Sequence, residues 1–163
     1  YSLHSFPTRR SSDLFNDFSN IVKKYNVNPN QVTLEITESV MLEKEDGFEL
    51  INNFSQAGFK ISIDDFGKGH SSFSYLKDYP VNEVKLDKSF IDEIEKPFNY
   101  YLVESIALLS EKLKVNLVLE GIETEKQVNI LKNLGCHFFQ GYFYSKPLTS
   151  NDFNDYIKKR LDL

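Results

Sequence analysis

Hydrophobic and polar positions follow two different periods along this chain of 163 residues. Short apolar runs rich in β-branched residues, some strictly alternating, are typical of strands. Longer stretches repeat apolar residues every three or four positions, as amphipathic helices do. The short runs predict strands at residues 31–37, 59–65, 83–87, 116–122 and 137–141. The longer stretches predict helices at residues 14–25, 38–57, 71–77, 99–113, 124–134 and 151–160.

Strands and helices follow one another in turn, a pattern that implies βαβ units and a parallel sheet. A doubly wound open sheet and a barrel both fit this order. Each strand carries a polar residue towards its end, and in a barrel such ends form one ring where the chemistry takes place. We therefore predict an α/β fold, a partial (β/α)8 TIM-like barrel with about five βα units. Because eight units close a barrel, either the sheet is open or residues outside this sequence supply the rest.

Residues 1–14 follow neither period. They resemble the in-frame translation of a sequencing-library adaptor, and the alternative is a disordered natural terminus. We set this segment apart, as one does for expression scars, and assign residues 15–163 to the folded domain. If the segment derives from an adaptor, natural upstream sequence is missing.

Composition narrows the classes of function. The formal net charge of -5 argues against general nucleic-acid binding, which normally requires a basic face. The single cysteine, Cys136, excludes an internal disulfide and fits a reducing compartment, where it would serve as a small core residue. No apolar run approaches the length that spans a bilayer, so we expect a cytoplasmic domain.

The strand ends carry the candidate chemistry. Asp64 and Asp65 end the second strand as adjacent carboxylates, and buried charges must be paired or bind metal. Glu35 and Glu120 end two other strands, and such oxygen ligands suit Mg²⁺ or Mn²⁺ rather than zinc. Lys85 ends a further strand and could orient a water or steady a phosphoryl oxygen.

Gln140, on the last strand, could position a ligand without adding charge. With these carboxylates and the lysine it makes a set that could hydrolyse a phosphate ester, with two metals roughly 3.5–4 Å apart activating a water. The alternative interpretation is a ring of structural salt bridges in which the lysine pairs with an acid.

Four segments resemble the successive motifs of the EAL domain, the bacterial cyclic-di-GMP phosphodiesterase. They read LEITES at 34–39, DDFGKGHSSFSYLKDYPVNEVKLDKSFI at 64–91, EGIET at 120–124 and QGYFYSKP at 140–147. The resemblance runs from about residue 14 to the end of the chain. It implies a (β/α)8-type barrel, two Mg²⁺ or Mn²⁺ ions in the complete domain, and opening of cyclic-di-GMP to linear pGpG. It also implies a parent protein with fused sensory or GGDEF-like domains, in some relatives membrane-anchored, and a homodimer is an option.

The resemblance also assigns roles. Metal ligands of the family match four acids of this sequence, Glu35, Asp64, Asp65 and Glu120. Glu120 is in addition a candidate base. Lys85 matches the lysine that holds the attacking water and the phosphate. Glu123 matches the acid that steadies the loop after Asp65, and Gln140 matches the glutamine that orients the site.

The sequence departs from the family pattern in three places. The signature Glu-Ala-Leu strand and a later strand with a metal-binding asparagine are absent, which removes a glutamate and an amide ligand. The loop after Asp65 reads Gly67-Lys68-Gly69-His70, where Thr or Ser and then Tyr are usual, and His137 stands where an acid is frequent. We therefore expect the 163-residue chain itself to be inactive or very weak. A non-catalytic cyclic-di-GMP receptor and an unrelated magnesium barrel acting on another substrate are the alternatives.

Overall fold

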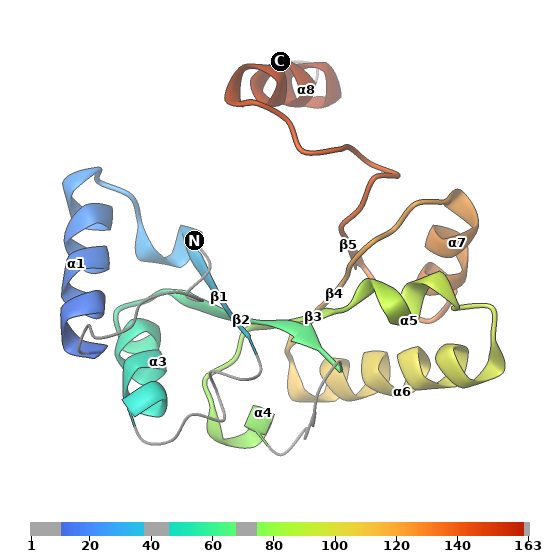
Figure 1. The fold of residues 1–163 in the computed structure, drawn as a ribbon, viewed down its shortest axis with the longest axis horizontal. Coiled ribbons are helices and arrows are strands. Elements are labelled where there is room, and N and C mark those ends of the chain that lie inside the picture. Colours follow the sequence, from blue (N-terminus) through green and yellow to red (C-terminus); the bar gives the residue numbers. More distant parts are fainter. Residues whose placement is uncertain (1–10, 38–45, 68–74, 162–163) are drawn as a thin grey trace.

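A computed structural model describes residues 11–37, 46–67 and 75–161 of the chain. These residues contain a five-stranded parallel sheet in which the strands lie in chain order (Figure 1). The strands are β1 (Thr33–Thr37), β2 (Lys60–Phe66), β3 (Glu83–Leu86), β4 (Asn116–Leu119) and β5 (Phe138–Phe139). A doubly wound sheet reverses its strand order at a switch point, and this one does not. The prediction of a partial barrel with about five βα units is confirmed.

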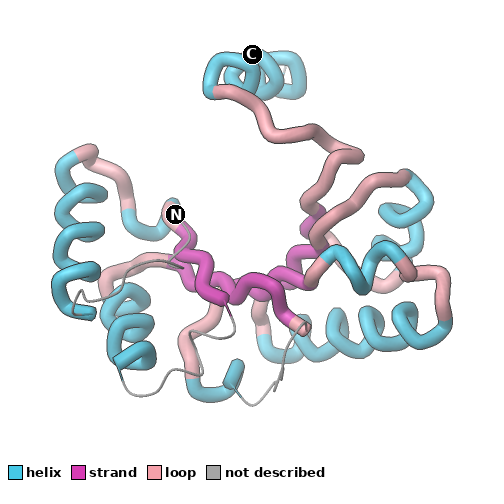
Figure 2. Tube along the Cα trace, viewed as in Figure 1, coloured by secondary structure: helices cyan, strands magenta, loops and turns pink. Residues whose placement is uncertain are grey.

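Helices flank the outer side of the curved sheet, and its concave side opens towards the last helix (Figures 1 and 2). The helical segments are α1 (Ser11–Lys24), the 3-10 turn η1 (Pro29–Gln31), α3 (Asp46–Gln56), α4 (Tyr75–Asp78), α5 (Lys88–Asp92), α6 (Pro97–Leu113), α7 (Glu125–Asn133) and α8 (Ser150–Leu161). Among these described helices, none is long and apolar enough to cross a membrane.

Alternate strand residues separate the core from the concave side. Successive side chains of a strand point to opposite faces of the sheet. On β2, Ile61 and Ile63 are each 1% exposed and belong to the hydrophobic core, whereas Ser62 between them hydrogen-bonds Glu83 on β3 at 3.0 Å. On β3, Val84 and Leu86 join the same core, and Lys85 between them points to the polar side. The outer side of the sheet is thus apolar, and the concave side carries the polar groups.

Element boundaries differ from the sequence predictions where polar caps intervene. The third strand ends at Leu86, one residue early, because the Asp87 side chain accepts a hydrogen bond from the Ser89 amide at 2.9 Å and begins α5. The first strand begins at Thr33 because Pro29 starts a 3-10 turn. The fourth strand was predicted to reach residue 122 and ends at Leu119, and the fifth has two residues.

Two predicted helices extend beyond the described residues. Residues 38–45 and 68–74 lie outside them, and the remaining parts of these helices are present as α3 and α4. Helix α1 begins at Ser11, inside the segment set apart as residues 1–14. The adaptor origin of that segment stays a prediction.

Cys136 is a core residue, as its sequence context predicts. It is 3% exposed, and burial raises the pKa of its thiol to about 11. The thiol therefore stays protonated at neutral pH and is not a nucleophile there.

The loop after β5 touches the loop after β4 backbone to backbone. Ile122 donates its amide to the Gln140 carbonyl at 3.1 Å and accepts from the Phe143 amide at 2.9 Å. A Cβ atom added at Gly141 would overlap the backbone of Ile122. Only glycine fits this contact, which holds Gln140 beside the end of β4.

We expect Gly141→Ala to lower the free energy of unfolding by about 2 kcal/mol, because the overlap falls on backbone that cannot rotate away. Urea unfolding followed by circular dichroism measures the change. Gly135→Ala is the matched control, since a Cβ there meets nothing within 4 Å and only its positive φ of 80° opposes alanine. That backbone cost is about 1 kcal/mol. Equal losses in the two variants would contradict the steric argument.

Candidate metal centre

Three carboxylates from neighbouring strands converge on the ammonium group of Lys85. Its Nζ lies 3.1 Å from Glu35 Oε1, 3.2 Å from Asp64 Oδ1 and 2.9 Å from Glu120 Oε1. Glu35 comes from β1, Asp64 from β2, Lys85 from β3, and Glu120 follows β4 directly. The structure therefore brings these four residues together, although Glu35 is the middle residue of β1 and not its end.

Lys85 is a buried cation held by its neighbours. Burial acts to lower its pKa, but the hydrogen bonds from Nζ to Glu120, Glu35 and Asp64 outweigh that effect and raise the pKa above the ordinary value of 10.5. The residue is 5% exposed. It is therefore a permanent positive charge at physiological pH, as a buried lysine among carboxylates must be.

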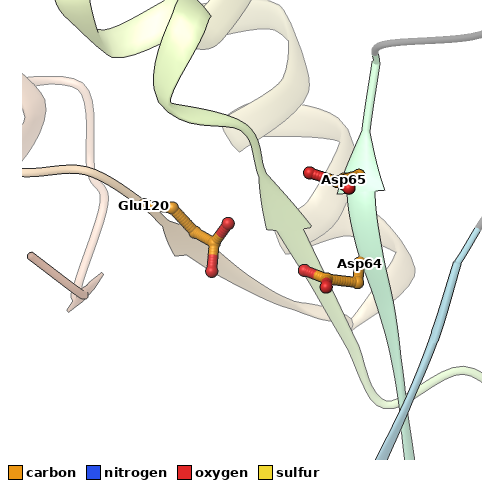
Figure 3. A group of neighbouring side chains, drawn as sticks. All are labelled: Asp64, Asp65 and Glu120. Atoms are coloured by element: carbon orange, nitrogen blue, oxygen red, sulfur yellow. The ribbon is translucent and has the colours of Figure 1, made fainter. Parts of the chain in front are cut away.

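Three of the predicted metal ligands form a tight group. Asp64, Asp65 and Glu120 each offer a carboxylate oxygen, and these oxygens all lie within 4.8 Å of one another (Figure 3). We call these residues the three-acid group. Two ligands of one Mg²⁺ or Ca²⁺ ion lie at most about 4–5 Å apart, given metal–oxygen distances of roughly 2.0–2.6 Å. All three side chains are half-buried, so the oxygens face a space that solvent can reach. The donor set fits a divalent cation.

A backbone irregularity aims the second aspartate at this group. Ile63 pairs with Val84 and Phe66 pairs with Leu86, so β2 carries one more residue than β3 over this stretch. Asp65 lies in this bulge with a positive φ of 55°. Neighbouring side chains of a regular strand would point to opposite faces, and a bulge re-aims one of them. The bulge therefore allows the neighbouring side chains of Asp64 and Asp65 to approach the same candidate cation position.

We expect Asp65→Ala to unfold more easily than Asp65→Gly, by about 1 kcal/mol. Both variants lose the carboxylate and its contacts, so their difference reports the left-handed backbone alone. Alanine is ordinarily the more stable residue of the two, and the order reverses where φ is positive. Urea unfolding in EDTA measures both variants. An alanine variant as stable as the glycine variant would show that position 65 is not held in this conformation.

Glu35 takes a place beside the three-acid group rather than in it. Its carboxylate binds Lys85, and half of its side chain is exposed, at 50%. Gln140 is exposed, and it borders a cavity of about 720 Å³ on the concave side together with Glu35 and Lys85. Aromatic side chains form part of the remaining lining of this cavity, among them Phe138 and Tyr144. A ligand in this cavity could reach a cation, an acid, an amide and aromatic rings.

Glu123 binds Lys88, the first residue of α5, in an exposed ion pair. Lys88 also lies 3.3 Å from Asp92, and its aliphatic stem covers Gly121, where an added Cβ would overlap it. Sequence reasoning missed this partner of Glu123, because 35 residues separate the two. The loop that Glu123 is predicted to steady lies at residues 68–74, outside the described part of the chain, so that role stays a prediction.

Parallel strands in chain order, with clustered carboxylates and a buried lysine at their carboxyl ends, define a barrel-type α/β protein with a candidate cation site at its strand ends. The chain belongs to the EAL domain family, whose model matches residues 5–147. The resemblance drawn from the four sequence motifs is confirmed.

Relatives match the chain along most of its length. The protein named "Probable cyclic di-GMP phosphodiesterase PdeB" of Escherichia coli strain K12 is 39% identical over 142 residues, which are 86% of this chain and 27% of PdeB. The solved structure of the EAL enzyme Bd1971, with cAMP and cyclic-di-GMP bound, matches with a TM-score of 0.87 and 34% identity over 90% of this chain and 39% of that one.

A complex of Klebsiella pneumoniae BlrP1 with manganese and cyclic-di-GMP matches with a TM-score of 0.78 and 29% identity. The match covers 83% of this chain and 35% of that one. The chain thus spans well under half the length of these relatives.

Proposed function

We propose that this chain supplies part of the active site of a metal-dependent cyclic-di-GMP phosphodiesterase, which opens the cyclic dinucleotide to linear pGpG. The main structural support is that carboxylate oxygens of Asp64, Asp65 and Glu120 lie within 4.8 Å of one another. The names of PdeB and of the Bd1971 complex, both similar to this chain, support the substrate. The water oxygen would bond to phosphorus as one P–O3′ bond breaks, leaving a 5′-phosphate and a free 3′-hydroxyl.

The residues fit Mg²⁺ or Mn²⁺, and a manganese complex of BlrP1 supports this choice. Asp64, Asp65 and Glu120 would hold the ions, with Glu35 beside them, and the complete domain would bind two. When bound, such ions lower the pKa of a water and neutralise charge that develops on the phosphoryl group.

Other groups of the chain would position the substrate and move the proton. Lys85 would donate a hydrogen bond to a phosphoryl oxygen or to the attacking water. Glu120, 2.9 Å from Lys85, would accept the proton that this water loses. Gln140 would orient the substrate from the wall of the cavity, and Glu123 would steady the loop after Asp65.

Release of pGpG from cyclic-di-GMP, followed by anion-exchange chromatography, tests the proposal. We expect turnover by the protein encoded in the complete reading frame, dependent on Mg²⁺ or Mn²⁺ and abolished by EDTA. The 163-residue chain alone should show little or none, because it lacks the family's Glu-Ala-Leu strand and metal-binding asparagine. Turnover that persists in EDTA, or binding of cyclic-di-GMP without turnover in the complete protein, would overturn the proposal.

Three further points stay predictions for this protein. They are fused sensory or GGDEF-like domains, a homodimer, and a cytoplasmic location. The chain matches only 27% of PdeB, so relatives of this kind contain much sequence beyond the part that resembles it.

A further inference from the structure

The contacts of Lys85 use all of its hydrogen-bonding capacity. An ammonium group has three N–H donors and no acceptor. Its Nζ has three carboxylate oxygens at 2.9–3.2 Å, one each from Glu120, Glu35 and Asp64. In this arrangement no N–H remains for a water or a phosphoryl oxygen. Lys85 must therefore release a carboxylate before it can hold a ligand.

Two of these three carboxylates also belong to the group that fits a divalent cation. Asp64 and Glu120 face Lys85 Nζ, and with Asp65 they bring their oxygens within 4.8 Å of one another. An ion bound there would lie a few ångströms from the ammonium group. Like charges at such a distance repel strongly where water is partly excluded, and Lys85 is 5% exposed.

We propose that Lys85 acts as a built-in counter-ion. It neutralises the carboxylates when no metal is bound, and its ion pairs with Asp64 and Glu120 weaken or break when a divalent cation binds these two residues. The exchange frees an N–H of Lys85, which then serves the substrate. This inference rests on the proposed metal-dependent function and adds a regulation of the same site: the residue that holds the substrate becomes available only when metal is present.

Binding of Mn²⁺ to the protein encoded by the complete reading frame, measured from the electron paramagnetic resonance signal of the free ion, tests the exchange. Lys85→Met removes the competing charge and keeps a side chain of similar length, so the variant should bind Mn²⁺ about tenfold more tightly, or more. Lys126→Met is the matched control, because it removes one positive charge from an exposed ion pair with Glu95. The control should bind as the unaltered chain does. Unchanged or weaker binding by Lys85→Met would overturn the inference, since a lysine that merely positions the ligands gives that result.

A measurement on the unaltered chain decides the question if Lys85→Met does not fold. The ¹⁵N signal of the Lys85 ammonium group, assigned through its side-chain carbons, should shift as diamagnetic Mg²⁺ is added. The signal of Lys126 should stay in place. A Lys85 signal that ignores saturating Mg²⁺ would overturn the inference.

The outcomes separate this inference from the function on which it rests. If neither the unaltered protein nor Lys85→Met binds Mn²⁺ when all of the reading frame is present, the metal site itself is wrong, and the proposed function and the inference fail together. If both bind and Lys85→Met binds no more tightly, only the counter-ion inference fails.

Discussion

Replacing Lys85 with methionine is expected to lower the free energy of unfolding of the metal-free chain by roughly 4 kcal/mol. Removing one partner of a buried ion pair typically costs about 3–5 kcal/mol, because the remaining charges stay partly desolvated without compensation. Here one ammonium group serves three carboxylates, of which Asp64 and Glu120 have side chains only 29% and 17% exposed. Methionine fills similar volume, so the loss reports mainly the charge.

Urea unfolding in EDTA, followed by circular dichroism, measures this loss. Lys126→Met should change the free energy of unfolding by less than about 1 kcal/mol, because both partners of its ion pair are more than half exposed. Added Mn²⁺ should restore much of the stability lost in Lys85→Met, since it supplies the missing positive charge. A loss as small as that of the control would mean that the carboxylates need no counter-ion.

The decrease in the free energy of unfolding caused by Lys85→Met should be constant between about pH 6 and pH 9. The folded state raises the pKa of Lys85 above its ordinary 10.5, so the stabilisation is fully present below 10.5. It declines only as the pH rises through the raised value. A difference between the unaltered chain and Lys85→Met that vanished between pH 6 and pH 9 would contradict the assignment of a permanently charged Lys85.

The convergence of the strand ends was predictable because it depends on topology. Parallel strands in chain order place their carboxyl ends at one rim, so Asp64, Lys85 and Glu120 had to meet if the barrel order held. Sequence reasoning left open whether Lys85 serves a ligand or pairs with an acid. The structure shows it bound to three acids. The inferred exchange would reconcile the two interpretations.

The bulge at Asp65 was not predictable, because it depends on how β2 pairs with β3. A run of alternating residues gives no sign that one of them takes a positive φ, and aspartate is one of the few types other than glycine that tolerate it. Helix α5 was missed for a different reason. Its five residues are too short to show a helical period, and its N-cap, Asp87, falls inside the stretch 83–87 that the pattern predicts as a strand.

In the protein encoded by the complete reading frame, Asp64→Asn is expected to reduce pGpG release about 10³-fold. Asparagine has the same shape as aspartate and keeps one oxygen, but it loses the charge that both the cation and Lys85 use. The carboxylate belongs to the three-acid group and lies 3.2 Å from Lys85 Nζ. The substitution therefore weakens both the proposed binding of the cation and the ion pair with Lys85. Initial rates at saturating Mn²⁺ measure the reduction.

Stability separates this effect from a fold defect. Asp64 is only one of three partners of Lys85, so Asp64→Asn should change the free energy of unfolding by about 1 kcal/mol, far less than Lys85→Met. Asp92→Asn is the matched control for activity, because it also neutralises an aspartate bound to a lysine, Lys88, and lies outside the three-acid group. Its rate should stay within about twofold of the unaltered protein, since exposed ion pairs contribute little. If Asp64→Asn turned over cyclic-di-GMP as fast as Asp92→Asn, the carboxylate pair would not be the metal centre, and the hydrolysis would need another site.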